Sequence, residues 1–300
     1  MIRLPKDVNL SELLKIIRRL GWDVSEILRS YNQNIKNSQE FQKKLKIINH
    51  KTGPVTAADI EISNLIKNRI KESFPTTDWD FLSEEDIKDH KKKKFTSKWL
   101  WLIDPLDGTR DFIGQTGEYA VHLALLYEKV AILSIVPIPS LDQLWIYQEG
   151  KGTWRESQEK VFEISNKPII RSLDQLTILT SKSHMHSEFK MLLEKLKPKE
   201  VIGMGSVGYK INSILKGFGD VYISYSLPNK TCPKDWDIVA PLSLIKGAGG
   251  KFTDMYGKEL SFMQNNSFEQ GGILVASFTQ NHQDICKQIS NIVKINSLHV

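Results

Sequence analysis

The stretch that decides the fold is Trp101-Leu-Ile-Asp-Pro-Leu-Asp-Gly-Thr-Arg110. The apolar and aromatic residues 98–103 predict a buried strand that ends in a carboxylate-rich turn. In that turn Pro105 fixes its own φ, and Gly108 has no side chain to block a phosphate that approaches the backbone N–H groups. We therefore predict that the strand delivers two aspartates to one point.

These two aspartates are Asp104 and Asp107. Together with a backbone carbonyl, such as that of Leu106, they form an all-oxygen environment that suits Mg²⁺. Asp-Gly is also among the strongest hairpin-turn signals, so the turn alone leaves a simple hairpin open as the alternative.

Three further acidic positions lie far away in the sequence. Thr56 and Asp59 form a capping-box pattern, so Asp59 could serve only the positive end of its helix. Asp237 stands near the start of a predicted helix and has the same alternative. Glu84 and Glu85 follow a short apolar strand and could be a solvated loop. If one of them binds metal, Glu84 is the better candidate, and Glu85 would lie next to the ligands without contacting the metal.

Hydrophobic periodicity predicts an α+β half followed by an α/β half. The first half has helices at 11–31 and from 56, and strands at 79–82, 98–103, 120–127, 130–138 and 144–148. The second half has strands at 176–180, 199–202, 220–224 and 272–277, and helices at 186–196, 207–215, 236–246 and 280–293. We place the boundary between an N-terminal sub-domain, 1–165, and a C-terminal sub-domain, 166–300.

Composition limits the class of protein. The 300 residues are 40% hydrophobic, and 41 basic against 35 acidic residues give a net charge of +6, which favours a small anionic partner over nucleic acid. Cys232 and Cys286 match no metal-ligand spacing and no disulfide framework. The N-terminus lacks the apolar stretch of a signal peptide, and no run approaches the roughly 20 apolar residues of a membrane span. We expect a soluble, cytoplasmic protein without membrane partners.

Four elements in order carry a family resemblance: Pro54-Val-Thr-Ala-Ala-Asp59, Leu82-Ser-Glu-Glu85, Asp104-Pro-Leu-Asp-Gly-Thr109 and Trp236-Asp237. Over nearly the whole chain they resemble the inositol monophosphatase superfamily. The resemblance implies a layered αβαβα sandwich of the inositol monophosphatase and fructose-1,6-bisphosphatase type. Pro-Val-Thr before Asp59, Ser-Glu-Glu-Asp at 83–86 and Arg-Asp-Phe-Ile at 110–113 look most like the CysQ-type 3′(2′),5′-bisphosphate nucleotidases.

The resemblance also implies roles for the acidic residues. Glu84, Asp104 and the Leu106 carbonyl would hold one Mg²⁺, while Asp104, Asp107 and Asp237 would hold a second, and the family pattern allows a weaker third ion. Such a pair of ions stabilises both the attacking and the leaving oxygen.

Catalysis and substrate binding are assigned in the same way. Thr109 and Asp59 would orient and deprotonate the attacking water, and the N–H groups of Gly108 and Thr109 would bind phosphate oxygens. The implied substrate contacts are Glu84, Leu106, Asp107, Gly108, Thr109, Gly205, Ser206, Lys210 and Asp237.

Three other features have weaker signals. Gly203-Met-Gly-Ser-Val-Gly208 satisfies a dinucleotide-binding pattern, but its preceding strand is short and Asp220 is closer than the usual offset of roughly 20 residues. His184 lies in a segment similar to one that faces the nucleotide in bisphosphate nucleotidases. The alternative is a surface or hydrogen-bonded histidine with a structural role only. Lys91 to Lys94 could steer polyanions or form a solvated loop.

We expect hydrolysis of 3′-phosphoadenosine 5′-phosphate to AMP and phosphate, a clearing reaction associated with sulfur metabolism. Inositol monophosphate or another sugar phosphate is the alternative substrate. A nucleotide-binding regulator without activity is a third reading. The expected partner is a small phosphorylated metabolite, and the chain would be a monomer or a homodimer.

Overall fold

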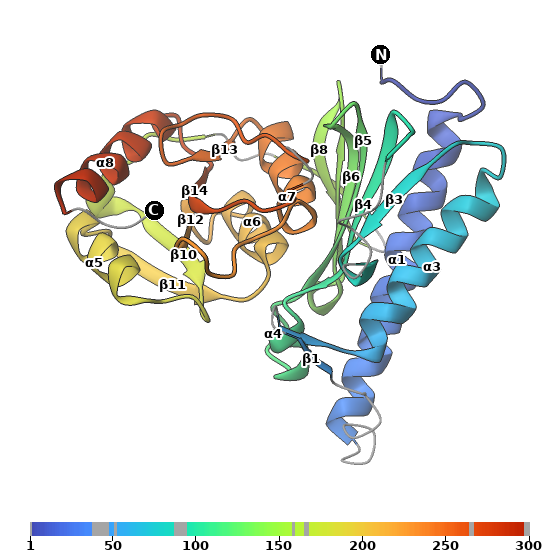
Figure 1. Ribbon diagram of the computed structural model, residues 1–300, viewed down its shortest axis with the longest axis horizontal. Coiled ribbons are helices and arrows are strands. Elements are labelled where there is room, and N and C mark those ends of the chain that lie inside the picture. Colours follow the sequence, from blue (N-terminus) through green and yellow to red (C-terminus); the bar gives the residue numbers. More distant parts are fainter. Residues whose placement is uncertain are drawn as a thin grey trace.

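The chain folds into five stacked layers of helices and sheets (Figure 1). A computed structural model describes residues 2–37, 48–50, 53–86, 95–157, 160–164, 168–263 and 267–296. Helices α1 (Leu10–Asn37) and α3 (Ala57–Ser73) form the first layer, and a seven-stranded sheet forms the second. Helices α6 (Val207–Leu215) and α7 (Asp235–Gly247), a five-stranded sheet, and helices α5 (Ser187–Leu196) and α8 (His282–Ile295) complete the stack. The predicted αβαβα sandwich is confirmed.

The larger sheet has the strand order β3-β4-β5-β6-β7-β8-β9. Its strands are β3 (Asp80–Ser83), β4 (Trp99–Asp107), β5 (Ala120–Tyr127), β6 (Val130–Ile138), β7 (Gln143–Gln148), β8 (Gly152–Glu156) and β9 (Val161–Glu163). Strand β3 runs parallel to β4, and all other neighbours are antiparallel. Strands β8 and β9 were not predicted, because β9 is exposed at the sheet edge and neither strand has a continuous apolar pattern.

The smaller sheet has the order β11-β10-β12-β14-β13. Its strands are β10 (Thr177–Ser181), β11 (Glu200–Met204), β12 (Val221–Ser226), β13 (Lys251–Asp254) and β14 (Gly272–Ser277). Strands β11, β10 and β12 are parallel, as the alternation of strands and helices indicated, whereas β14 is antiparallel to both of its neighbours. The sheet is therefore mixed. The hairpin of β1 (Ile48–His50) and β2 (Gly53–Val55) and the short helix α4 (Thr109–Ile113) complete the chain.

Three separate cores hold the layers together. Strand β4 contributes side chains to two of these cores, because successive strand residues point to opposite faces of the sheet. Trp101 and Ile103 belong to the core under α1 and α3, while Leu100 and Leu102 belong to the core against α6 and α7. A strand buried on both faces needs a continuous apolar run, and this is what residues 99–103 supply.

Two expectations fall outside the part of the chain that is described. The sub-domain boundary proposed between residues 165 and 166 lies within 165–167, and the lysine run at 91–94 also lies outside the described ranges. Both cysteines are free and buried, in keeping with the expected lack of a disulfide framework. Within the described ranges, no helix combines the length and apolar character that crossing a membrane requires.

Candidate active site

Strand β4 does not end before its two aspartates, as the sequence suggested, but continues through Asp107. Between Asp104 and Asp107 the register against β5 shifts, since Asp104 pairs with His122 and Asp107 pairs with Ala120. Residues three apart on a regular strand point to opposite faces, and the extra residue of a β-bulge cancels this reversal. The bulge therefore lets both carboxylates face the same cavity. The prediction of a turn at these residues is wrong, because they form the bulged end of β4.

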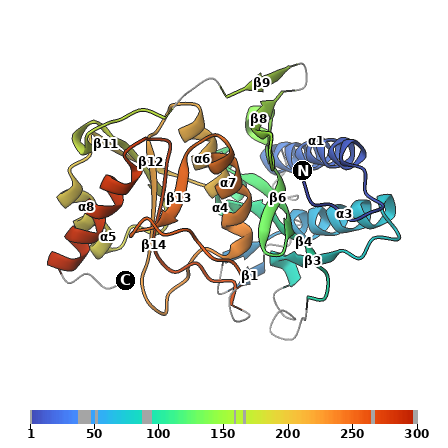
Figure 2. The same cartoon turned by 90° about the horizontal axis from the view of Figure 1, so that it is seen from above.

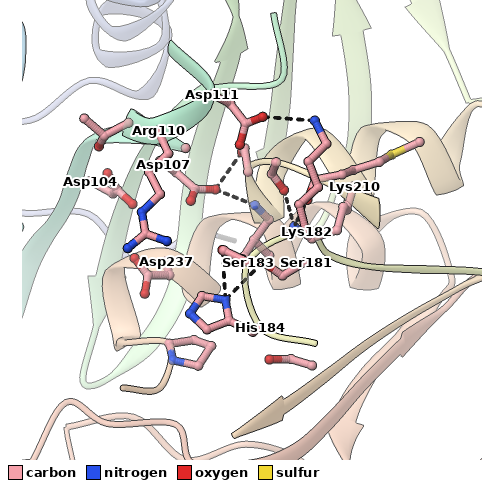
Figure 3. A pocket seen from close by; sticks show the side chains of 18 of the residues that line it. Asp104, Asp107, Arg110, Asp111, Ser181, Lys182, Ser183, His184, Lys210 and Asp237 are labelled. Carbon is pink, nitrogen blue, oxygen red and sulfur yellow. Dashed lines mark hydrogen bonds and ion pairs between the residues drawn. The ribbon is translucent and has the colours of Figure 1, made fainter. Parts of the chain in front are cut away.

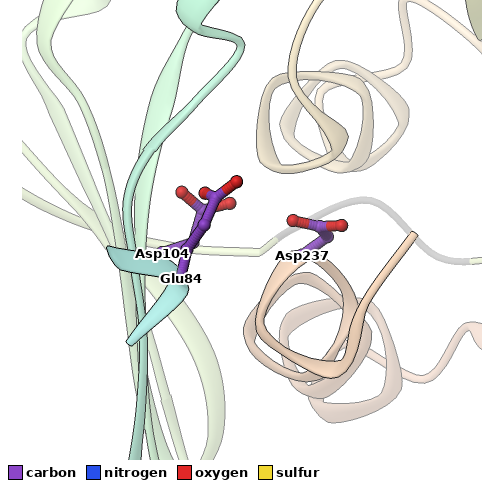
Figure 4. Close-up of side chains that lie close together, drawn as sticks. All are labelled: Glu84, Asp104 and Asp237. Atoms are coloured by element: carbon purple, nitrogen blue, oxygen red, sulfur yellow. The ribbon is translucent and has the colours of Figure 1, made fainter. Parts of the chain in front are cut away.

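Carboxylates from three segments meet beside this bulge. Ligand-capable oxygens of Glu84, Asp104 and Asp237 all lie within 4.8 Å of one another. Figure 4 shows Glu84 and Asp104 on the side of the large sheet and Asp237 facing them from the start of α7. The cluster thus joins residues 153 positions apart, counted from 84 to 237, across the boundary between two layers.

The electrostatics of this cluster fit a divalent cation. Burial, together with the charges of neighbouring carboxylates, raises the pKa of Glu84 and Asp104 well above the ordinary value and raises that of Asp237 to about 7. Carboxylates held together in this way repel one another unless protons or a cation neutralise them. Their oxygen-only donor set suits Mg²⁺. Glu84, Asp104 and Asp237 could therefore hold such an ion.

Asp59 and Thr109 form a second polar unit next to the cluster. Thr56 caps α3, and its backbone N–H and its hydroxyl donate to Asp59 at 2.8 and 2.5 Å, so the predicted capping box is present. The Thr109 hydroxyl lies 3.0 Å from the Leu106 carbonyl oxygen and within hydrogen-bonding reach of Asp59. Burial raises the pKa of Asp59 to about 6 despite these donors. A carboxyl with that pKa can accept a proton near neutral pH.

Mg²⁺ binding is expected to strengthen as the pH rises from 6 to 8. Protons bound to raised-pKa carboxylates must leave when the cation binds, and Asp237 titrates at about 7. Calorimetry should show about a tenfold gain in affinity per pH unit for each proton released. The affinity rises with pH because the carboxylates are protonated at low pH, where protons compete with the cation, and ionised at high pH. An affinity independent of pH over this range would contradict the assignment of these residues to the ion.

Asp107 connects the bulged strand to α6. Its Oδ2 accepts hydrogen bonds from Ser206 Oγ at 2.6 Å and from the backbone N–H groups of Val207 and Gly208 at 2.5 and 3.3 Å. These N–H groups open the helix, where positive potential favours an anion. In a dinucleotide fold this end would receive a pyrophosphate. Here the protein's own carboxylate occupies it, so the glycine-rich pattern does not form a dinucleotide site.

Two glycines allow the close approach of the segments around this junction. Gly108 has a φ of 90°, and a Cβ there would lie 2.9 Å from the carbonyl oxygen of Glu118. Gly205 leaves no room for a Cβ against that same carbonyl. Its N–H donates to Glu118 Oε2 at 2.7 Å. The close packing of these segments therefore requires glycine at both positions.

A cavity of about 230 Å³ opens above the carboxylates. Its wall contains all the sequence-predicted site residues except Asp59, which lies behind Thr109: Glu84, Asp104, Leu106, Asp107, Gly108, Thr109, Gly205, Ser206, Lys210 and Asp237. His184 also lies on the wall, with its Nδ1 at 3.1 Å from Ser181 Oγ and 3.2 Å from Ser183 Oγ (Figure 3). The metal-facing and substrate-facing candidates therefore share one cavity.

Sequence reasoning missed several residues that shape this site. Lys182 Nζ lies 3.0 Å from Asp111 Oδ1 and 2.5 Å from Glu118 Oε2, which links the residue after β10 to α4 and to the segment that follows α4. His122 lies fully buried under the carboxylates, with Nε2 at 3.2 Å from Asp107 Oδ2. Asp111 lies in the Arg-Asp-Phe-Ile stretch and Lys182 lies next to His184, but neither pattern indicates these contacts. Only the pairing of β4 with β5 and the packing of the two halves bring them to the site.

Comparisons with known proteins identify the family of this chain. The family model described as the Inositol monophosphatase family matches residues 9–294. The 3′(2′),5′-bisphosphate nucleotidase CysQ of Escherichia coli K12 is 28% identical over 256 residues, which cover 85% of this chain and 98% of the relative. CysQ of Salmonella typhimurium is 29% identical over 75% of this chain and 86% of its own length.

Solved structures show the same fold. The IMPase of Thermotoga maritima superposes with a TM-score of 0.67 at 23% identity and covers 93% of this chain and 99% of its own. The extragenic suppressor protein suhB of Bartonella henselae gives a TM-score of 0.72 at 18% identity, with 92% and 98% covered.

Proposed function

The chain belongs to the inositol monophosphatase family and is a phosphatase, and on that premise we propose that it is a Mg²⁺-dependent 3′(2′),5′-bisphosphate nucleotidase. The reaction would convert 3′-phosphoadenosine 5′-phosphate to AMP and phosphate. The observation that carries the proposal is the set of mutually close Glu84, Asp104 and Asp237 carboxylates beside a polar cavity. The curated relatives with the same activity in their names support the choice of a nucleotide.

Bound Mg²⁺ would supply a Lewis acid that neutralises the charge on the phosphoryl oxygens. Asp59 would accept the proton of the attacking water, because its raised pKa of about 6 lies close to neutral pH. Thr109 would orient that water through its hydroxyl, which already contacts both Asp59 and the Leu106 carbonyl. The N–H groups of Gly108 and Thr109 would bind the phosphoryl oxygens, and water would attack without a phosphoenzyme.

The remaining wall of the cavity supports a nucleoside as the leaving part. It carries side chains that can donate or accept hydrogen bonds: Ser181, Ser183, His184, Tyr222, Ser224, Tyr225, Ser226 and Thr231. The Ser181 and Ser183 hydroxyls lie next to Nδ1 of His184. The second ring nitrogen, Nε2, would then be the atom that contacts a ligand. A base and a ribose offer polar edges to which such a wall can form hydrogen bonds.

A phosphate-release panel tests the proposal. Purified protein with Mg²⁺ would be given 3′-phosphoadenosine 5′-phosphate, inositol 1-phosphate and fructose 1,6-bisphosphate under identical conditions. We expect kcat/KM for the nucleotide to exceed the other two by about tenfold or more, since sites built with hydrogen-bonding groups reject substrates that leave them unpaired.

Each alternative has its own outcome in that panel. Preference for inositol 1-phosphate or the sugar bisphosphate would establish the second reading. Release of phosphate from none of the three, with the nucleotide still bound, would identify a regulator without activity. A reaction without added Mg²⁺ in the presence of a chelator serves as the blank.

A further inference from the structure

The described part of the cavity contains three side chains that carry a positive charge at neutral pH, namely Arg110, Lys182 and Lys210. A substrate with two phosphates needs a cation for the phosphate that is not hydrolysed, because the acidic cluster and its ion would hold the other one. The contacts of the three cations decide which of them is available for that second phosphate.

Lys182 already has two anionic partners. Its Nζ lies 3.0 Å from Asp111 Oδ1 and 2.5 Å from Glu118 Oε2, and these carboxylates raise its pKa. Glu118 Oε2 also accepts the N–H of Gly205 at 2.7 Å, so this group is part of the junction between two segments. A phosphate at Lys182 would have to compete with two fixed carboxylates, which disfavours it as the binding group.

Lys210 is enclosed by the protein. Its side chain is 2% exposed, and its Nζ donates to the main-chain carbonyls of Gly205 and Met204, the second at 3.4 Å. The ring of Tyr222 lies with its centroid 5.1 Å from the same nitrogen. Burial lowers the pKa of Lys210 to about 8. Its ammonium group is therefore engaged before any ligand arrives.

Arg110 differs from Lys182 because it lacks a carboxylate partner among the described residues, and from Lys210 because it is exposed. Among the described residues it makes no side-chain ion pair, and its side chain is exposed at the cavity wall. It follows Thr109 directly at the start of α4, and Figure 3 shows its guanidinium extending into the cavity. Burial lowers the pKa of His184 on the same cavity wall, and the charge of Arg110 lowers it further. Arg110 thus lies between the phosphoryl site and the nucleoside wall.

We propose that Arg110 binds the second, non-hydrolysed phosphate and makes the site selective for bisphosphates over monophosphates. The inference rests on the proposed nucleotidase function and adds the residue that distinguishes the two substrate classes. The planar guanidinium suits this task because its fork of N–H donors matches two oxygens of one phosphate. Of the other described cations of the cavity, Lys182 is held by two carboxylates, and Lys210 is buried with its ammonium group bonded to main-chain carbonyls.

The test compares two substrates that differ only in the second phosphate. Phosphate release would be measured from 3′-phosphoadenosine 5′-phosphate and from adenosine 3′-phosphate with the wild type, Arg110→Gln and Arg110→Lys. Hydrogen bonds to a charged group contribute enough for the ratio of the two kcat/KM values to fall about 10- to 100-fold in Arg110→Gln. Arg110→Lys should give an intermediate ratio, because the charge remains and the fork is lost.

A matched control and an independent measurement complete the design. Arg19→Gln removes an exposed arginine of α1, on the far side of the large sheet, and should leave the ratio unchanged. Calorimetric binding of AMP and of adenosine reports on the second phosphate without turnover. Arg110→Gln should weaken AMP binding and affect adenosine binding less.

The outcomes separate the two proposals. If the wild type hydrolyses neither nucleotide, the proposed function is wrong, and the binding of AMP still tests Arg110. If the wild type is active and Arg110→Gln lowers kcat/KM equally for both substrates, Arg110 serves the reacting phosphate and the inference is overturned. Equal AMP affinity in the wild type and in Arg110→Gln overturns it as well.

Discussion

Asp104→Asn is expected to lower phosphate release by about a thousandfold or more while the metal-free protein remains folded. Asp104 is 1% exposed and lies at the centre of the carboxylate cluster, so the substitution removes a ligand charge where the cation is needed most. Loss of a single preorganised electrostatic group typically costs 10²- to 10³-fold, and here the ion itself is weakened too. Phosphate release with the preferred substrate of the panel measures the effect.

The stability of the same variant carries the sharper test. Without metal, Asp104 is repelled by Glu84, Asp107 and Asp237, so an uncharged amide should leave the melting temperature unchanged or raise it. Added Mg²⁺ should stabilise the wild type through mass action and should stabilise Asp104→Asn much less. If the metal-free variant unfolds at a markedly lower temperature, Asp104 has a structural role and its assignment to the ion is wrong.

Asp107→Ala should lose both activity and stability. The substitution removes the acceptor of Ser206 Oγ and of the Val207 and Gly208 N–H groups, which leaves the start of α6 without its anion. Loss of a helix cap costs about 1 kcal/mol, and a buried donor left unsatisfied costs about 1–3 kcal/mol more. We expect a loss of about 2 kcal/mol or more in the free energy of unfolding, measured by urea denaturation without metal.

Asp107→Asn is the matched control for this prediction. Its carbonyl oxygen can still accept from the N–H groups of α6, whereas its charge is gone, so stability should recover more than activity. The metal-free Asp104→Asn and Asp107→Ala variants should therefore shift in opposite directions, or the first should not shift at all. Equal destabilisation of the Asp104→Asn and Asp107→Ala variants would contradict this prediction, because it would show that both aspartates stabilise the metal-free fold.

Much of the fold could be predicted from the sequence because periodicity reports burial. The strands at 120–127, 130–138 and 272–277 and the helix at 207–215 occur with the predicted bounds. The mixed order of the smaller sheet could not be predicted, because strand direction depends on where a chain returns and not on local apolar pattern. Strand β13 was missed because its four residues, Lys251–Asp254, contain a single apolar side chain, Phe252, and so give no apolar run.

The candidate site shows the same division. Asp59, Glu84, Asp104 and Asp237 were named from motifs, and they gather around one cavity or directly behind it. The role of Asp107 at the start of α6 could not be read from the sequence, because it depends on Val207, a hundred positions away. Glu118 was missed for the same reason, since Lys182 and Gly205 reach it only after the layers stack.

The acidic cluster draws on both the large sheet and α7, and this has a consequence for how the protein is made. During translation Glu84 and Asp104 leave the ribosome long before Asp237. The growing polypeptide therefore lacks one of the three clustered carboxylates until most of the chain has been synthesised. Only the finished stack brings the last carboxylate into place. On the proposed function, a truncated translation product that lacks α7 would therefore release no phosphate, because it lacks Asp237.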